Sequence, residues 1–209
     1  MIESARQRRA GPVSSARWLV PSMTLVLAAS AACTSGSPGS RSDEPASPFA
    51  ACDALTVAPT PAPDSSAAAA ADLPDLQLPC FTGGRQVRLT ELRGPAVINL
   101  WASWCDPCRA ELPAMQRLAD ATAGRLHVIG VDSYDSRDAA ASFATDQRVT
   151  LPTLFDRDMR LMSALGRPAV PVTVFLDAAG RRHVYDQVPP DDAQLAALVG
   201  AHTGVTVQP

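Results

Sequence analysis

The feature that most constrains this chain is a pair of cysteines, Cys105 and Cys108, at the junction of two sequence patterns. The apolar run at 96–101 is typical of a buried strand, and the residues after Cys108 repeat apolar side chains at helical spacing. The N-terminus of a helix offers unpaired N–H groups and a partial positive charge, and both stabilise a thiolate. We therefore expect Cys105 to be the attacking thiol of a redox-active pair and Cys108, one turn into the helix, to be the resolving thiol.

Three segments of the chain together resemble one known family. These segments are LRGP at 92–95, NLWASWCDPCRAELP at 99–113 and VPVTVFLD at 170–177. They resemble the thioredoxin superfamily, and more closely its bacterial extracytoplasmic TlpA/ResA/DsbE-type branch. The resemblance runs from about residue 76 to residue 199. It implies an α/β thioredoxin-like fold, in which a mixed central sheet has helices on both faces.

The resemblance also implies roles for residues outside the cysteine pair. Pro171 is at the place of the family's cis-proline, which would turn the Val170 backbone toward an extended substrate segment. Glu111 is at the place of a carboxyl group that lies near the pair and assists proton transfer when Cys108 attacks. Thioredoxins proper use a buried Asp on the preceding strand, where this chain has Asn99, so Glu111 is the acid–base candidate.

The residues around Cys105 are candidates for substrate binding. Trp104 directly precedes the attacking thiol, and Asp106 and Pro107 lie between the two cysteines. Pro107 suits a first helical turn, where its missing N–H costs nothing. The charge of Asp106 disfavours the thiolate, so we expect no extreme thiol pKa.

The remaining pattern agrees with the α/β fold class. Strands alternate with helices and a hairpin follows, which predicts a mixed sheet covered on both faces. After a short early strand near 87–89, the predicted elements are strands at 126–131, 151–155, 172–177 and 182–188 and helices at 137–147, 159–165 and from 191 onward.

The N-terminal third has the composition of a targeting segment followed by a tether. Residues 1–33 have an Arg-rich start, a short apolar stretch and small residues before Cys33, which predicts a signal peptide with lipidation at Cys33. A signal anchor and plain secretion are the alternatives, and each puts the domain outside the cytoplasm. Residues 34–74 are rich in Pro, Ala and Ser and predict a linker, which leaves residues 75–202 for the thioredoxin-like domain.

The chain has five cysteines. If Cys33 is acylated and Cys105 pairs with Cys108, Cys52 and Cys80 remain. In an oxidising compartment we expect these two to form a structural disulfide that fastens the end of the linker to the domain. Two free thiols, or a second redox pair that relays electrons, are the alternatives.

The net charge and the placement of the histidines argue against nucleic-acid binding and metal binding. The formal net charge of −3 disfavours contact with a phosphate backbone. His127, His183 and His202 are scattered and form no pair at helical spacing, so we predict no metal site. The expected chemistry needs no cofactor besides the cysteine pair.

We therefore predict an extracytoplasmic thiol–disulfide oxidoreductase, held at the membrane by its N-terminus, that acts on secreted or membrane-attached proteins. The resemblance implies a reductant that serves cytochrome c maturation and receives electrons from a membrane thiol–disulfide donor. A disulfide-forming oxidant and a Cu(I)-binding module using two soft thiolates are alternatives. A thiol peroxidase is a further alternative, although Ile98 and Ala102 stand where family peroxidases carry Pro and Thr.

Overall fold

The structure, a computed structural model, describes residues 47–60, 70–187 and 191–207. All of them belong to one unit that spans residues 43–209. The predicted signal segment with Cys33 lies outside the described residues.

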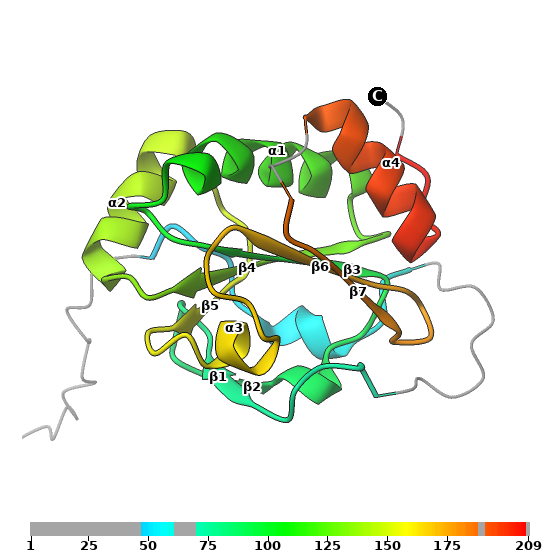
Figure 1. Cartoon of the computed structure of the whole chain (residues 1–209), viewed down its shortest axis with the longest axis horizontal. Helices are drawn as coiled ribbons and strands as arrows, with labels where there is room; N and C mark the ends of the chain where they lie inside the picture. The colour runs from blue at the N-terminus through cyan, green and yellow to red at the C-terminus, as the bar shows by residue number, and fades with distance from the viewer. Residues whose placement is uncertain (1–46, 61–69, 188–190, 208–209) are drawn as a thin grey trace, which may run out of the picture. The chain divides into compact units, whose positions relative to one another are not determined.

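The core of the fold is a five-stranded sheet in the order β5-β4-β3-β6-β7 (Figure 1). β3 pairs in parallel with β4, and β4 with β5, whereas β6 and β7 add antiparallel strands on the other side. The strands are β3 (Ala96–Trp101), β4 (His127–Ser133), β5 (Thr153–Asp156), β6 (Val172–Leu176) and β7 (Arg182–Tyr185).

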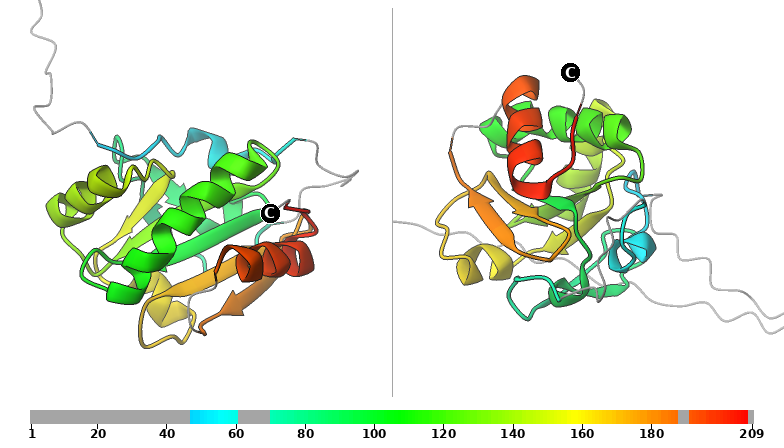
Figure 2. Two further views of the ribbon diagram at one scale, coloured as in Figure 1. Left: turned by 90° about the horizontal axis from the view of Figure 1, so that it is seen from above. Right: turned by 90° about the vertical axis from the view of Figure 1, so that its right-hand side faces the viewer.

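Helices cover both faces of this sheet. The helices are α1 (Asp106–Thr122), α2 (Arg137–Gln147), α3 (Arg160–Ala164) and α4 (Asp192–Thr203). Helices α1, α2 and α4 lie over one face, and α3 lies on the other (Figures 1 and 2). The second face also carries an antiparallel pair, β1 (Gln77–Pro79) with β2 (Gln86–Arg88), and a short 3-10 helix, η2 (Leu89–Glu91).

β3 is the central strand, and all six of its residues are buried. Its side chains alternate between the faces, so Val97 and Trp101 pack with α1 while Ile98 and Leu100 pack on the α3 side. A strand covered on both faces needs a nearly continuous apolar run, which is what the sequence shows at 96–101. β3 ends four residues before Cys105 and so delivers the cysteines to the start of α1.

The predicted α/β class with a mixed sheet and helices on both faces is confirmed. The helix at 137–147 and the strand at 96–101 have the predicted bounds. The strand predicted at 151–155 begins later, at Thr153, and the strand predicted at 182–188 ends at Tyr185.

Residues 34–74 were predicted to form a linker, but within this range residues 47–60 and 70–74 are packed onto the domain. These stretches pack against the domain through side chains that are at most 7% exposed: Phe49, Cys52, Leu55, Ala71 and Leu73. A short 3-10 helix, η1 (Asp53–Thr56), starts next to Cys52. A few apolar residues spaced along a Pro/Ala-rich stretch are enough to fold onto a core that already exists. The rest of the predicted linker, 34–46 and 61–69, lies outside the described residues.

The C-terminal bound predicted for the domain, residue 202, is also too short. Val205 and Val207 follow α4 and pack against the same core as α1 and α4. The packed domain therefore extends beyond the predicted 75–202 at both ends.

Candidate active site

Cys105 and Cys108 lie at the N-terminus of α1 and are joined by a disulfide with an S–S distance of 2.06 Å. Cys105 is the N-cap residue, and its Sγ accepts the backbone N–H of Cys108 at 3.3 Å. This is the N–H environment that stabilises a thiolate once the disulfide opens. Pro107 is in the first turn, as expected.

Cys105 is less exposed than its place at the start of the turn suggests. It is 5% exposed and Cys108 is 0% exposed. The neighbours Trp104, Asp106 and Pro107 are exposed. A partner would therefore first meet these neighbours and then the Cys105 sulfur, with Cys108 behind it.

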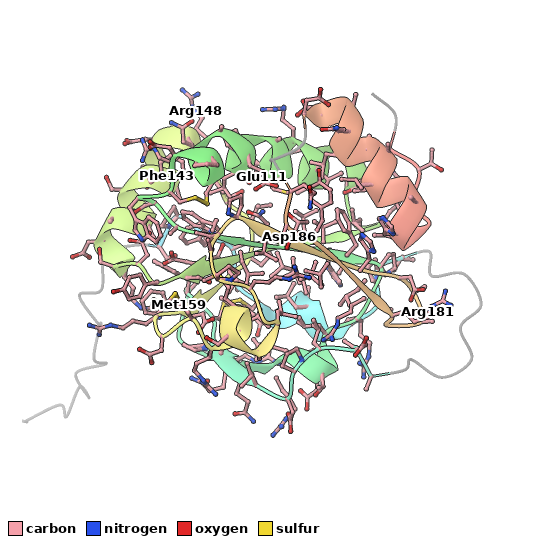
Figure 3. The ribbon with its side chains drawn as sticks, viewed as in Figure 1. Glu111, Phe143, Arg148, Met159, Arg181 and Asp186 are labelled. Atoms are coloured by element: carbon pink, nitrogen blue, oxygen red, sulfur yellow. A yellow bond between two sulfur atoms is a disulfide. The ribbon has the colours of Figure 1, made fainter. Side chains whose placement is uncertain are left out.

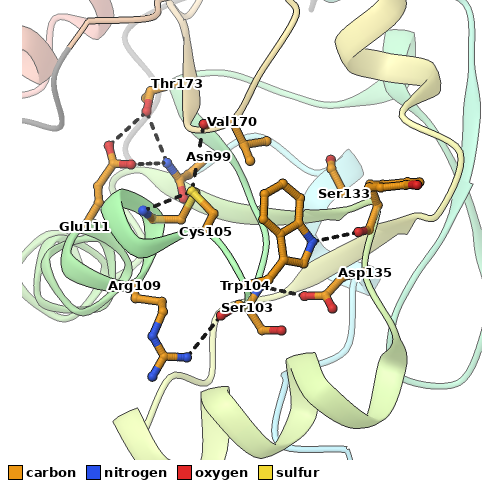
Figure 4. The surroundings of a disulfide bond; sticks show 12 residues. Asn99, Ser103, Trp104, Cys105, Arg109, Glu111, Ser133, Asp135, Val170 and Thr173 are labelled. Atoms are coloured by element: carbon orange, nitrogen blue, oxygen red, sulfur yellow. Dashed lines mark hydrogen bonds between the residues drawn. A yellow bond between two sulfur atoms is a disulfide. The ribbon is translucent and has the colours of Figure 1, made fainter.

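The segment before β6 approaches the Cys105 sulfur from the other side. The Val170–Pro171 peptide bond is cis. The Val170 carbonyl oxygen lies 3.8 Å from Cys105 Sγ (Figure 4). Val170 and Pro171 are half-buried, so a partner bound at Cys105 would lie beside this backbone.

Glu111 is buried in a three-residue hydrogen-bond cluster between α1 and the sheet (Figures 3 and 4). Asn99 Nδ2 donates to Glu111 Oε2 at 3.1 Å and to Thr173 Oγ1 at 3.2 Å, and Thr173 Oγ1 donates to Glu111 Oε1 at 3.3 Å. Burial raises the pKa of Glu111, and the hydrogen bonds from Asn99 and Thr173 only partly oppose the rise. A carboxyl group with a raised pKa can exchange a proton closer to neutral pH.

Ser103 is held by side chains on both sides of its backbone. Its N–H donates to Asp135 Oδ2, and its carbonyl oxygen accepts from Arg109 Nη1 at 3.0 Å. The Arg109 guanidinium also stacks on Phe143, 4.4 Å from the ring centroid. These contacts fix the turn that leads to Trp104. Asp135 was not predicted as a site residue, although its place just after β4, beside the end of β3, is a signal for one.

Asp132 is a second buried carboxyl group near this turn. It is the neighbour of Trp101 across β3 and β4, is 0% exposed, and interacts with the carboxyl group of Asp135. Burial first, and then the negative charge of Asp135, raise its pKa to about 9. Asp132 is therefore protonated at neutral pH. No motif predicted it.

The other cysteine pair is also joined. Cys52 and Cys80 form a disulfide and are 2% and 1% exposed. Exchange requires a thiolate to reach a disulfide sulfur, so this burial argues against the alternative of an electron relay.

Two of the three histidines form a pair that the sequence analysis missed. His183 on β7 and His202 on α4 stack with ring centroids 3.6 Å apart and planes at 5°. His127 instead bonds the Val57 carbonyl oxygen at 2.7 Å. Across residues 47–60, 70–187 and 191–207, no cluster of three or more His, Cys, Asp or Glu side chains could hold a metal ion.

A family model described as the AhpC/TSA family matches residues 69–181, a stretch that contains β3, the cysteine pair and β6. The chain belongs to the AhpC/TSA family. The resemblance to ResA- and DsbE-type thioredoxin-like proteins is also confirmed by similar proteins that carry these names.

Two curated relatives and one solved structure illustrate the similarity. The chain is 26% identical to thiol-disulfide oxidoreductase ResA of Bacillus subtilis over 102 residues, covering 48% of this chain and 57% of ResA. It is 40% identical to a thiol:disulfide interchange protein DsbE homolog of Paracoccus denitrificans over 101 residues, covering 46% and 54%. The chain thus matches little more than half the length of these relatives. A secreted thiol-disulfide isomerase from Corynebacterium glutamicum superposes with a TM-score of 0.53 at 27% identity, covering 61% of this chain and 82% of the isomerase.

Within the part of the chain that the structure describes, no helix has the length and apolar character needed to cross a bilayer.

Proposed function

We propose that this protein is a thiol–disulfide oxidoreductase that exchanges its Cys105/Cys108 pair with disulfides of other proteins. The observation that carries the proposal is the Cys105–Cys108 disulfide at the start of α1, where Cys105 Sγ accepts the Cys108 N–H. The names of the relatives support the same chemistry.

The first step of the proposed reduction is attack by the Cys105 thiolate on one sulfur of a substrate disulfide. A new S–S bond forms between Cys105 and that sulfur, and the substrate bond breaks. The second substrate sulfur leaves as a thiolate and takes a proton from solvent. The helix N-terminus lowers the cost of holding the Cys105 thiolate before attack.

The second step is resolution by Cys108. Cys108 loses its proton, for which Glu111 is the proposed acceptor, and attacks the Cys105 sulfur. The Cys105–Cys108 disulfide forms, the bond between Cys105 and the substrate sulfur breaks, and that sulfur leaves as a thiolate that takes a proton from solvent. Two electrons have then passed to the substrate, and the protein is left in the disulfide state that the structure shows.

The proposal also covers the direction of electron transfer and the location of the protein. We infer a reductant that is recharged by a membrane thiol–disulfide donor and serves secreted proteins, apocytochrome c among them. The N-terminal composition supports an extracytoplasmic domain attached to the membrane through lipidation of Cys33. The similar C. glutamicum isomerase is a secreted protein, which supports the same side of the membrane.

The reduction potential of the Cys105/Cys108 pair tests the proposal. The full chain is equilibrated in thiol–disulfide buffers, and the oxidised fraction is measured by thiol alkylation and mass spectrometry. A value near thioredoxin, about −270 mV, is expected for a reductant. A value near DsbA, about −120 mV, would instead identify an oxidant. Consumption of peroxide with no disulfide exchange would contradict the proposal.

A further inference from the structure

Two exposed aromatic side chains lie together, and one of them, Trp104, directly precedes Cys105. Among the described residues, the exposed large apolar side chains are Val57, Trp104 and Tyr134, at 64%, 58% and 60%. The rings of Trp104 and Tyr134 meet edge to face, with centroids 6.4 Å apart and planes at 87°. We call these two side chains the aromatic ridge.

The ridge is held in a fixed orientation. Trp104 Nε1 donates to the Tyr134 carbonyl oxygen at 2.8 Å (Figure 4). The Tyr134 N–H donates to the Asp156 carbonyl oxygen at 3.1 Å. The contacts that hold Ser103 also fix the backbone just before Trp104. Rigid aromatic rings lose little conformational entropy when a partner covers them.

Tyr134 combines an uncommon backbone conformation with an exposed side chain. Tyr134 has a φ of 56°, in the left-handed region that glycine and asparagine adopt more easily than tyrosine. Its side chain is mostly exposed, so it recovers little of this cost through burial. The fold leaves this ring uncovered, so it is available to a partner.

We propose that the Trp104–Tyr134 ridge binds an apolar side chain next to the cysteine of a substrate protein, and that Tyr134 determines this specificity. The inference rests on the proposed function, because it assigns the substrate class of the same site.

Geometry places such a side chain on the ridge. A substrate sulfur bonded to Cys105 is attached to a chain whose neighbouring Cα atoms are 3.8 Å away. Trp104 is the residue next to Cys105, and the Val170 carbonyl borders the other side of the sulfur. The residue beside the substrate cysteine therefore lies within reach of Trp104 and, through it, of Tyr134.

The chemistry of the ridge selects the side chain. Covering two half-exposed rings favours a branched apolar or aromatic side chain. Asp106 is exposed and follows Cys105, and Asp135 is half-buried and follows Tyr134. These carboxylates disfavour an acidic substrate segment.

The test compares two hexapeptide disulfides that differ only beside the cysteine, one with Leu and one with Ser. The pre-reduced full chain, in single-turnover reactions, is expected to reduce the Leu peptide with a second-order rate constant about tenfold higher than for the Ser peptide. In Tyr134→Asn the Leu-to-Ser ratio should fall to about twofold or less. Asn suits the left-handed conformation, and the carbonyl that Trp104 bonds remains, so this variant keeps the fold.

Two variants serve as controls. Tyr134→Phe keeps the ring and should keep the ratio, and Val57→Asn removes the third exposed apolar side chain and should leave the ratio unchanged. Since the readout is a ratio, a general loss of activity does not imitate the effect. A wild-type ratio near one, or a Tyr134→Asn ratio equal to wild type, would overturn the docking proposal while the proposed function stands. Failure of wild type to exchange with either peptide would refute the proposed function itself.

Discussion

At the scale of single residues, two buried carboxyl groups accompany the cysteine pair. Glu111 on α1 bonds Asn99, and Asp132 is the sheet neighbour of Trp101. Asn99 and Trp101 are two residues apart on β3, so both carboxyl groups lie on the sheet face that α1 covers. They differ in their partners, because Glu111 accepts hydrogen bonds from Asn99 and Thr173, whereas Asp132 interacts with a second carboxyl group, that of Asp135.

Glu111→Gln should slow the resolving step. Gln keeps the size of the side chain and can still bond Asn99, but it cannot take the proton of Cys108. We expect resolution of a preformed mixed disulfide to slow by about 10²-fold, with loss of one ionisation from its pH–rate profile. Rapid-quench measurement across pH checks this, with the exposed Glu91→Gln as the matched control. A profile and rate equal to wild type would show that Glu111 is only structural.

Asp132→Asn should change the pH dependence of stability. The carboxyl group is neutral in the folded chain at pH 7, because its pKa is raised to about 9, but it is ionised in the unfolded chain. Wild-type stability therefore falls as pH rises between about 4 and 9, by about 1.4 kcal/mol per pH unit from this group. Asn does not titrate, so the unfolding free energy of the variant should lack this fall. Measured by urea titration, the difference between variant and wild type should therefore grow by about 1.4 kcal/mol per pH unit between pH 5 and 8.

The exposed Asp146→Asn supplies the control for this measurement and should follow the wild-type curve. Parallel curves for Asp132→Asn and wild type would show that Asp132 is already ionised in the folded chain.

At the scale of elements, the local sequence pattern was enough to predict the bounds of some helices and strands, but not how other segments pack. The strand at 96–101 and the helix at 137–147 were predicted to the residue from the sequence pattern, and the structure shows Ser136 capping the helix. The packing of 47–60 could not be predicted, because it depends on a core that forms elsewhere in the chain. The contact between Trp104 and Tyr134 could not be predicted from the sequence either, because it depends on how β3 and β4 align.

The histidine pair that joins β7 to α4 should make that junction sensitive to acid. Burial first, and then the charge of His183, lower the pKa of His202 in the folded chain. The folded chain then binds fewer protons than the unfolded chain, so stability is lost as pH falls below about 6.5. His202→Phe keeps a ring against His183 and Phe175 and should flatten the fall in Tm between pH 7 and 5. An unchanged fall in this variant would contradict the assignment.

At the scale of the whole molecule, the segment 47–60 ties the start of the described domain to both faces of the sheet. Phe49 packs with Phe81 and Trp101 on the α1 side, and Leu55 packs on the α3 side. The Cys52–Cys80 disulfide holds this segment to the residue after β1. The predicted tether and this segment are therefore different parts of 34–74.

Replacing both Cys52 and Cys80 with Ala should lower the stability of the fold but leave disulfide exchange by Cys105 and Cys108 intact. The bond closes a loop with a sequence separation of 28 residues, so its loss should cost roughly 3–4 kcal/mol of unfolding free energy. Urea unfolding measures this cost. Exchange by Cys105 and Cys108 should persist without denaturant, and its loss in a folded double variant would restore the relay interpretation.

The central claim is that Cys105 attacks and Cys108 resolves, and trapping of the mixed disulfide tests it most directly. The full chain with Cys108→Ser is mixed with a peptide disulfide, and the adduct is mapped by mass spectrometry; Cys105→Ser is treated in the same way. We predict that the first variant accumulates the peptide on Cys105, because no resolving thiol remains, and that the second forms almost no adduct at Cys108, which is fully buried. Equal adduct formation at Cys108 in the second variant would contradict the account.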